Sequence, residues 1–343
     1  MQPINFAILG TGMVAEYHRK AIEANADLGA RLTAVGHYDP ARFDEIGGRF
    51  GVPCLGLADL LARADVDVVC ICTPSGQHAE QTVAAAEAGK HVLVEKPMAL
   101  SLADADRMIV ACAEAGVHLG VVFQRRAEPL FQTIHAALQA GDLGDLTLGV
   151  VTMPYVRPQS YYESAAWRGT WALDGGGVLM NQGIHLVDLL LWYLGDPVEV
   201  QAHAATLHRR IEVEDTLAAT LRFENGALAT ITATTTAALG FPHRLELYGT
   251  GGGIQVEGEN VGRWTLVEAA QGRVAPPRSE GPAEAGSGGD PRSIAPTGHI
   301  AITRNVIEAI RDDASLRIDG REGRRSLAAV LAIYQAAGLL VPE

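Results

Sequence analysis

One lysine of this chain lies where a positive charge could assist chemistry. Lys96 follows Glu95 after the apolar run at 92–94, and a proline stops the run at position 97. This order places Glu95 and Lys96 at the tip of a predicted strand. An ammonium group there could hydrogen-bond a substrate hydroxyl and stabilise an alkoxide that develops on it.

One histidine is placed to move a proton. His185 lies in a predicted helix over 179–193, with Asn181 four residues before it and Asp188 three residues after it. At this spacing the three side chains share one face of a regular helix. Histidine exchanges protons near neutral pH. We therefore expect His185 to transfer a proton, as a base in one direction of a reaction and as an acid in the other, and Asn181 to hydrogen-bond the substrate or position His185. For Asp188 we expect a supporting role.

A glycine turn near the N-terminus predicts a dinucleotide site. The apolar run that ends at Leu9 leads into a G-x-G-x-x-A pattern and then into a helix. Such glycines permit the tight turn and the close approach of a pyrophosphate, which the helix N-terminus attracts. The predicted cofactor contacts here are Gly10, Thr11, Gly12, Met13 and Val14.

The second strand leaves the choice between NAD and NADP open. In NAD enzymes an acidic residue near the end of this strand accepts a hydrogen bond from the ribose 2′-hydroxyl. Here His37 and Tyr38 occupy that region, and Asp39 could serve only as a helix cap. The absence of Lys and Arg from residues 32–40 favours NAD, although a protonated His37 would attract a 2′-phosphate.

A further turn follows the apolar run at 66–71. Open α/β sheets bind ligands at the carboxyl ends of their strands. We expect the segment 73–78 to line the ribose on the nicotinamide side, with a plain turn capped by its serine as the alternative. The predicted contacts are Thr73, Pro74, Ser75 and His78.

Two kinds of strand pattern must position these residues. Up to residue 123, short apolar runs alternate with amphipathic helical segments, which predicts a doubly wound parallel sheet of the Rossmann type. Beyond it, strand-like runs follow one another, with an Asn225-Gly226 hairpin signal, and predict a large open, mostly antiparallel sheet in a C-terminal α/β domain. We place the domains at 1–123 and 124–343, and leave open a return of the final helices to the first domain. The segment 269–297 predicts a mobile loop.

Composition narrows the classes of partner. The formal net charge is −13 and no basic block is present, so we expect neither nucleic acid nor a membrane surface as partner. Cys70 and Cys72 alternate within an apolar run and are expected, like the other two cysteines, to be buried thiols. The chain shows no export signal, no membrane span and no metal-ligand spacing. We therefore expect a cytoplasmic protein without a metal.

The combination of Glu95-Lys96-Pro97 with the glycine turn resembles the Gfo/Idh/MocA family, which includes glucose-fructose oxidoreductase and the inositol dehydrogenases. The segments at 175–188, 192–195 and 319–323 extend the resemblance along the whole chain. It implies an NAD(P)-dependent oxidoreductase that moves a hydride between the nicotinamide and a secondary alcohol or ketone of a sugar, nucleotide sugar or polyol. It also implies a homodimer or homotetramer formed through the C-terminal sheet.

The resemblance also assigns roles to residues. It makes Lys96 and His185 the catalytic lysine and histidine, and it places Gln124, Trp167 and Arg168 near the nicotinamide, together with Glu95. Many polyol-oxidising relatives carry Asp where this chain has Asn181, which is more similar to members that act on nucleotide-linked or modified sugars. Further candidates for the substrate wall, each with a solvated loop as the alternative, are Arg126, Tyr155, Arg157, Tyr161 and Tyr162.

Two other functions are compatible with such a fold. One is an imine or pyrrole-type reductase, which would not need the pair of Lys96 and His185. The other is a non-catalytic nucleotide-binding sensor, which loss of either residue would favour, and both are present.

Overall fold

The computed structural model describes residues 2–267 and 295–339, and the chain divides into two compact units. The described part of the first unit is 2–127 with 295–327, and that of the second is 128–267 with 328–339. We predicted a division after residue 123. In the structure the first unit extends to residue 127 and also includes the segment 295–327, a return to the first domain that the prediction had left open. Residues 269–294 of the predicted loop lie outside the described residues.

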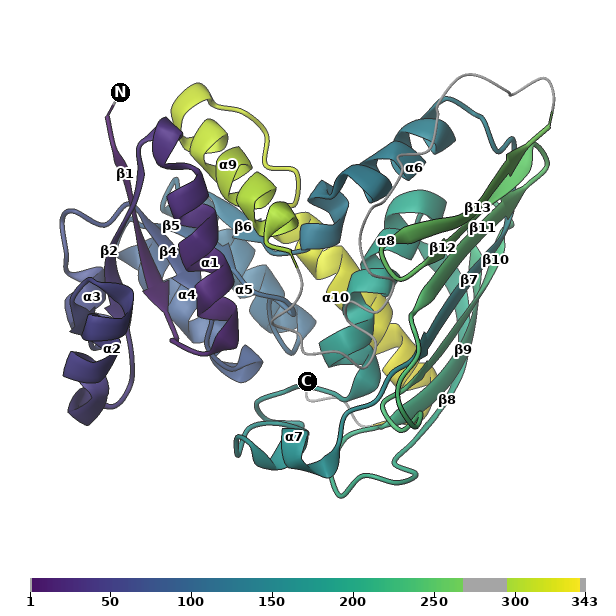
Figure 1. Cartoon of the computed structure of the whole chain (residues 1–343), viewed down its shortest axis with the longest axis horizontal. Coiled ribbons are helices and arrows are strands. Elements are labelled where there is room, and N and C mark those ends of the chain that lie inside the picture. Colours follow the sequence, from purple (N-terminus) through teal and green to yellow (C-terminus); the bar gives the residue numbers. More distant parts are fainter. Residues whose placement is uncertain (1, 268–294, 340–343) are drawn as a thin grey trace. The chain divides into compact units, whose positions relative to one another are not determined.

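The first unit contains the predicted parallel sheet, with the strand order β3-β2-β1-β4-β5-β6 (Figure 1). The fold class is confirmed. The strands are β1 Ile4–Leu9, β2 Ala30–Gly36, β3 Cys54–Leu55, β4 Val68–Ile71, β5 His91–Val94 and β6 Leu119–Val121. The helices of this unit are α1 Met13–Ala24, α2 Phe43–Phe50, α3 Leu57–Leu61, α4 His78–Glu87, α5 Leu102–Glu114 and α9 Thr297–Asp312.

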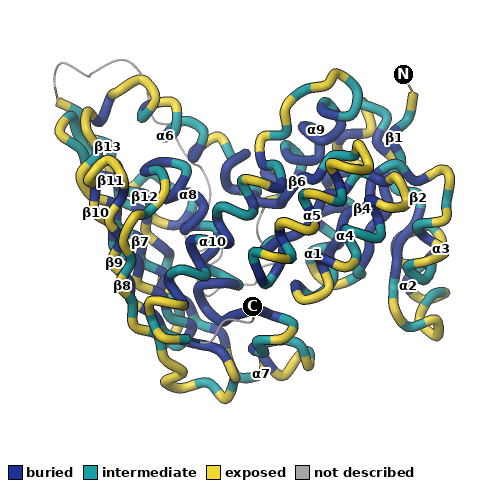
Figure 2. Tube along the Cα trace, turned by 180° about the vertical axis from the view of Figure 1, so that it is seen from behind, coloured by how far each residue is buried: buried dark blue, intermediate teal, exposed yellow. Residues whose placement is uncertain are grey.

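Burial explains why the strands of the first unit read as continuous apolar runs. All four residues of β4 are buried, as expected for a central strand covered by helices on both faces (Figure 2). The four cysteines are free and buried, as predicted. Helix α9 packs against α1, which is why a late segment of the chain belongs to the first unit (Figure 1).

The second unit contains a seven-stranded sheet in the order β13-β12-β11-β7-β10-β9-β8. Neighbouring strands are antiparallel except β7 and β10, so the prediction of a mostly antiparallel sheet is confirmed. The predicted hairpin at Asn225-Gly226 joins β9 to β10. The strands are β7 Leu146–Pro154, β8 Pro197–Ala205, β9 Thr216–Phe223, β10 Leu228–Thr234, β11 Arg244–Gly249, β12 Gly252–Glu257 and β13 Asn260–Leu266.

Helix α8 covers one face of this sheet. Gly149 on β7 leaves room for it, because a Cβ there would lie 2.8 Å from side-chain carbons of Leu190 and Leu194. The helices of the unit are α6 Pro129–Gln139, α7 Gln159–Glu163 and α8 Ile184–Leu194, and α10 Gly320–Ala336 begins in the first unit and ends in the second. None of the described helices is long and apolar enough to cross a membrane.

The predicted regular helix over 179–193 is wrong in its first part. Residues Val178–Gly183 form a π-helix, and the α-helix begins only at Ile184. The wider turn of a π-helix changes the angle between successive side chains. The shared face predicted for Asn181, His185 and Asp188 therefore does not follow from regular helical spacing.

Candidate active site

The glycine turn has the geometry that a pyrophosphate needs. Gly10 has a φ of +89°, and a Cβ there would lie 2.7 Å from the carbonyl carbon of Cys72. A Cβ on Gly12, in contrast, would meet no protein atom within 4 Å. Gly12 is also the N-cap of α1 and has no side-chain capping bond, so the first N–H groups of the helix are available to a phosphate. These residues fit a dinucleotide.

The other predicted cofactor contacts of the turn are Thr11, Met13 and Val14. The carbonyl oxygen of Thr11 accepts a hydrogen bond from Arg49, and Met13 and Val14 form the first turn of α1. The side chain of Met13 is 42% exposed, so it could cover a bound ligand.

At the end of β2, His37 Nδ1 accepts a hydrogen bond of 3.1 Å from the backbone N–H of Asp39, and its ring stacks on Tyr38. Tyr38 is 91% exposed. Asp39 accepts a hydrogen bond from the N–H of Ala41 and so caps the following 3-10 helix, the alternative that we considered for it.

The turn after β4 is held by a buried histidine. The two ring nitrogens of His78 lie 2.9 Å from the carbonyl oxygen of Thr73 and 2.8 Å from that of Pro97. His78 thus ties together the turns that follow β4 and β5. Ser75 is buried and makes no capping bond, so the alternative of a serine-capped turn is not observed, and Pro74 is the N-cap of its 3-10 helix.

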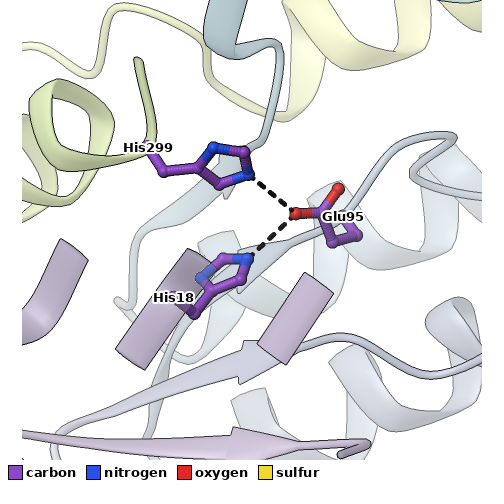
Figure 3. Close-up of side chains that lie close together, drawn as sticks. All are labelled: His18, Glu95 and His299. Carbon is purple, nitrogen blue, oxygen red and sulfur yellow. Dashed lines mark hydrogen bonds and ion pairs between the residues drawn. The ribbon is translucent and has the colours of Figure 1, made fainter. Parts of the chain in front are cut away.

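The Glu95-Lys96 pair lies at the end of β5, as predicted. Glu95 points into the unit, where His18 of α1 and His299 of α9 meet its carboxylate (Figure 3). The backbone N–H of Lys96 lies 3.3 Å from Glu95 Oε2, and the Lys96 side chain is half-buried. Gln124, also half-buried, opens a 3-10 helix after β6, and Gly298 of α9 packs directly on it. We did not predict roles for His18 and His299, which are far from Glu95 in the sequence.

In the second unit, a buried aspartate connects two predicted site segments. Asp174 accepts hydrogen bonds of 2.6 Å from the Asn181 amide and 2.8 Å from the backbone N–H of Gly169. The oxygen of the Asn181 amide accepts from Gln182. His185 is half-buried one residue into α8, and Asp188 is fully buried. Asp174 was not among the predicted site residues.

A second buried acid anchors the π-helix. The carboxylate of Glu214 accepts hydrogen bonds from the N–H groups of Gly177 and Leu179 and from the hydroxyl of Tyr334. That hydroxyl in turn accepts from the N–H of Met180. Glu214 and Tyr334 therefore satisfy backbone donors that the start of a helix leaves without partners. Their contribution could not be read from a sequence in which they are 120 residues apart.

Burial raises the pKa of Glu214 to about 7, against hydrogen bonds that favour the carboxylate. The folded protein then binds one more proton than the unfolded chain between pH 4.5 and 7, so its stability falls as pH rises through this window. We expect the free energy of unfolding of the wild type, relative to that of Glu214→Gln, to fall by roughly 2 kcal/mol from pH 5 to pH 8. Urea unfolding at both pH values measures it. Glu212→Gln is the control, and a pH-independent difference would contradict the assignment.

Arginines and aromatic rings gather around the predicted Trp167-Arg168 pair. The Arg168 guanidinium lies over the rings of Tyr161 and Trp167, at 4.3 and 4.5 Å, and hydrogen-bonds the Tyr161 hydroxyl. Arg157 lies near Tyr155 and Tyr161. Tyr162 is buried against Thr235. Arg126, in contrast, belongs to the first unit and pairs with Glu322.

Comparison with known proteins accords with this geometry. A model described as an oxidoreductase family with an NAD-binding Rossmann fold matches residues 4–123, and a model of the GFO/IDH/MocA C-terminal domain matches residues 131–255. The chain is 30% identical over 276 residues to inositol 2-dehydrogenase of Rhizobium meliloti, covering 78% of this chain and 79% of the relative. It is 33% identical over 294 residues to 1,5-anhydro-D-fructose reductase of Ensifer adhaerens, covering 84% and 82%.

Among solved structures, the WlbA dehydrogenase from Bordetella pertussis in complex with NADH and UDP-GlcNAcA superposes with a TM-score of 0.86 and 34% identity, covering 100% of this chain and 99% of that one. The fit of the glycine turn to a dinucleotide agrees with these matches, and the predicted resemblance is confirmed. The chain belongs to the Gfo/Idh/MocA family of NAD(P)-dependent oxidoreductases.

Proposed function

We propose that this oxidoreductase acts on a secondary alcohol, or the corresponding ketone, of a sugar that carries a negative charge. The observation that carries the proposal is the pair Arg157 and Arg168. Arg157 is 8% exposed, and Arg168 is half-buried. Within residues 2–267 and 295–339 neither forms an ion pair, and the Nε of each is buried without a hydrogen-bond partner. A buried cation is costly unless an anion pairs with it, and guanidinium groups suit carboxylate and phosphate.

Within the second unit, hydrogen bonds connect the turn beside Arg168 to the segment that contains Asn181. Asp174 joins the turn at Gly169, next to Arg168, to the amide of Asn181. An anionic group bound by Arg168 would thus be held in a fixed position relative to the segment that leads into His185. The similarity to a dehydrogenase solved with UDP-GlcNAcA, a nucleotide-linked sugar acid, supports this class of substrate.

The residues would divide the chemistry as follows. His185 takes the hydroxyl proton in oxidation and returns it in reduction. Lys96 hydrogen-bonds the reacting oxygen and stabilises its negative charge. Asn181 is a positioning residue, because Asp174 and Gln182 occupy both ends of its amide. The turn at 10–14 and the segments after β2, β4 and β5 hold the dinucleotide. When bound, the dinucleotide would supply the hydride acceptor for oxidation of the carbinol carbon and the hydride donor for the reverse reaction.

A substrate comparison tests the proposal. We expect reduction of NAD with UDP-GlcNAcA at a kcat/KM about 10²-fold above that with UDP-GlcNAc, which lacks the carboxylate, or with myo-inositol. Arg168→Met should remove most of this preference, and Arg210→Met, at an exposed position of the same unit, should leave it unchanged. Equal kcat/KM values for UDP-GlcNAcA and UDP-GlcNAc would refute recognition of the carboxylate, and an equal value for uncharged myo-inositol would refute anion recognition altogether.

We also propose NAD as the preferred cofactor. Arg42, the nearest candidate to bind a 2′-phosphate, is already engaged by both carboxylate oxygens of Glu45. His37→Asp should weaken NADPH binding relative to NADH by about 1 kcal/mol, roughly fivefold, through like-charge repulsion. Dissociation constants of both reduced cofactors measure this effect. An unchanged ratio would show that His37 does not lie beside the adenosine ribose.

The outward face of the second sheet supports a homo-oligomer. Its middle is composed of uncharged side chains that alternate with buried ones along the strands, including Leu148, Ala218, Leu228, Thr230 and Thr232. Leu148 and Leu228 are 37% and 53% exposed. A second copy of the chain would cover this surface.

Four buried free thiols fit the predicted reducing, cytoplasmic location.

A further inference from the structure

Two buried histidines from distant parts of the chain meet at one buried carboxylate in the first unit. Nε2 of His18 lies 2.9 Å from Oε1 of Glu95, and Nε2 of His299 lies 3.5 Å from the same oxygen (Figure 3). The exposed fractions are 1%, 7% and 5% for His18, Glu95 and His299. Neither cofactor binding nor substrate recognition, as described above, requires such a cluster.

The two histidines stabilise the ionised form of the Glu95 carboxylate. Burial alone would raise the pKa of Glu95, but hydrogen bonds from His18 and His299 hold it well below its usual value. Burial lowers the pKa of His299, despite the carboxylate beside it. Burial also opposes a charge on His18, yet its pKa lies well above the usual value, with Cys72 and Cys70 beside it. Glu95 is therefore ionised, and His18, which lies closer to it than His299 does, is its stronger hydrogen-bond partner.

The same carboxylate reaches the turn that carries Lys96. Its second oxygen, Oε2, lies 3.3 Å from the backbone N–H of Lys96. On the far side of the turn, the ring of His78 contacts the carbonyl oxygen of Pro97. The turn is thus held through Glu95 by helices α1 and α9, and through Pro97 by α4.

We propose that His18 and His299 are positioning residues for the reaction, because together they fix the Glu95 carboxylate and, through it, the backbone from which Lys96 extends. This inference rests on the proposed role of Lys96 in orienting the substrate oxygen. The buried location of all three groups makes the arrangement stiff, since an unpaired charge there would be costly.

The alternative for such a cluster is a metal site. One ligand atom from each of the three residues lies within 4.8 Å of the others, and two imidazoles with one carboxylate are a known ligand set. The separation of 2.9 Å between His18 and Glu95 is that of a charge-assisted hydrogen bond, so we assign a proton between them. Elemental analysis of the purified protein should find substoichiometric zinc, iron and manganese, and one tightly held metal ion per chain would overturn the assignment.

The activity test compares two replacements of His299. His299→Leu removes the donor, and we expect kcat to fall about 10²-fold with little change in the dissociation constant of NADH. His299→Gln keeps an N–H donor and should recover most of the loss. His18→Leu should lower kcat in the same way. His118→Leu, on the same unit outside the cluster, is the matched control. Equal losses in the Leu and Gln variants would contradict a role for the hydrogen bond.

A second readout does not depend on turnover. The rate of acetylation of Lys96, followed by mass spectrometry over a pH series without nucleotide, reports the environment of its amine. His299→Leu should shift this profile for Lys96 and not for the exposed Lys20, and His299→Gln should restore it. If His299→Leu does not fold, Glu95→Gln replaces it with the same expectation. An unshifted Lys96 profile would overturn the positioning role, whereas an active Lys96→Ala enzyme would instead overturn the proposed role of Lys96.

Discussion

Lys96→Ala and His185→Ala should each lower kcat by about 10²–10⁴-fold while the dissociation constant of NADH changes little. A general acid–base group, and a cation that stabilises developing charge, act on the transition state rather than on the bound nucleotide. Steady-state kinetics with a turned-over sugar, together with a fluorescence titration of NADH, separate the two effects.

Matched controls make the result specific to these residues. Lys20→Ala on α1 and His208→Ala in the second unit remove the same side-chain types at exposed positions and should leave kcat at the wild-type value. Added imidazole should partly restore His185→Ala if the ring supplies only a proton acceptor. A variant at position 96 or 185 with wild-type kcat would exclude that residue from the mechanism.

Gly12→Val should abolish measurable nucleotide binding without loss of the fold. The backbone of Gly12 is extended, with φ of −72° and ψ of −162°, which valine adopts readily. Since a Cβ there meets no protein atom within 4 Å, the added side chain enters the space that the pyrophosphate needs. Titration calorimetry with NADH measures the loss.

The control for Gly12→Val is Gly262→Val, which adds the same side chain at an exposed position of β13 in the second unit. It should bind NADH as the wild type does. Circular dichroism verifies that both variants fold. Wild-type affinity in a folded Gly12→Val protein would show that the glycine turn does not hold the dinucleotide.

Features that depend on residues close together in the sequence could be predicted. The glycine turn, the parallel strands up to residue 123 and the hairpin at Asn225-Gly226 depend on neighbouring residues and on apolar periodicity. The π-helix at Val178–Gly183 was missed, because the carboxylate of Glu214 and the hydroxyl of Tyr334 fix its first turn from distant positions in the chain. The short strand β3 and the edge strand β13 carry too little apolar pattern to be recognised.

The supporting residues of the site show the same limit. Lys96, Asn181 and His185 could be selected from motif and chemistry. Asp174, which holds Asn181, and His18 with His299, which hold Glu95, act through contacts made only in the folded protein. Histidine in an apolar helix also has a structural explanation in most sequences, so its type alone gave no signal.

Isotope transfer tests the central claim most directly. UDP-GlcNAcA with deuterium on the carbons of its sugar ring is incubated with NAD and the enzyme, and the reduced nucleotide is analysed by mass spectrometry. Hydride transfer from a carbinol carbon predicts NADH that carries one deuterium, formed by the wild type and at a strongly reduced rate by His185→Ala. Reduced nucleotide without deuterium, or none with any charged or neutral sugar tested, would contradict the account.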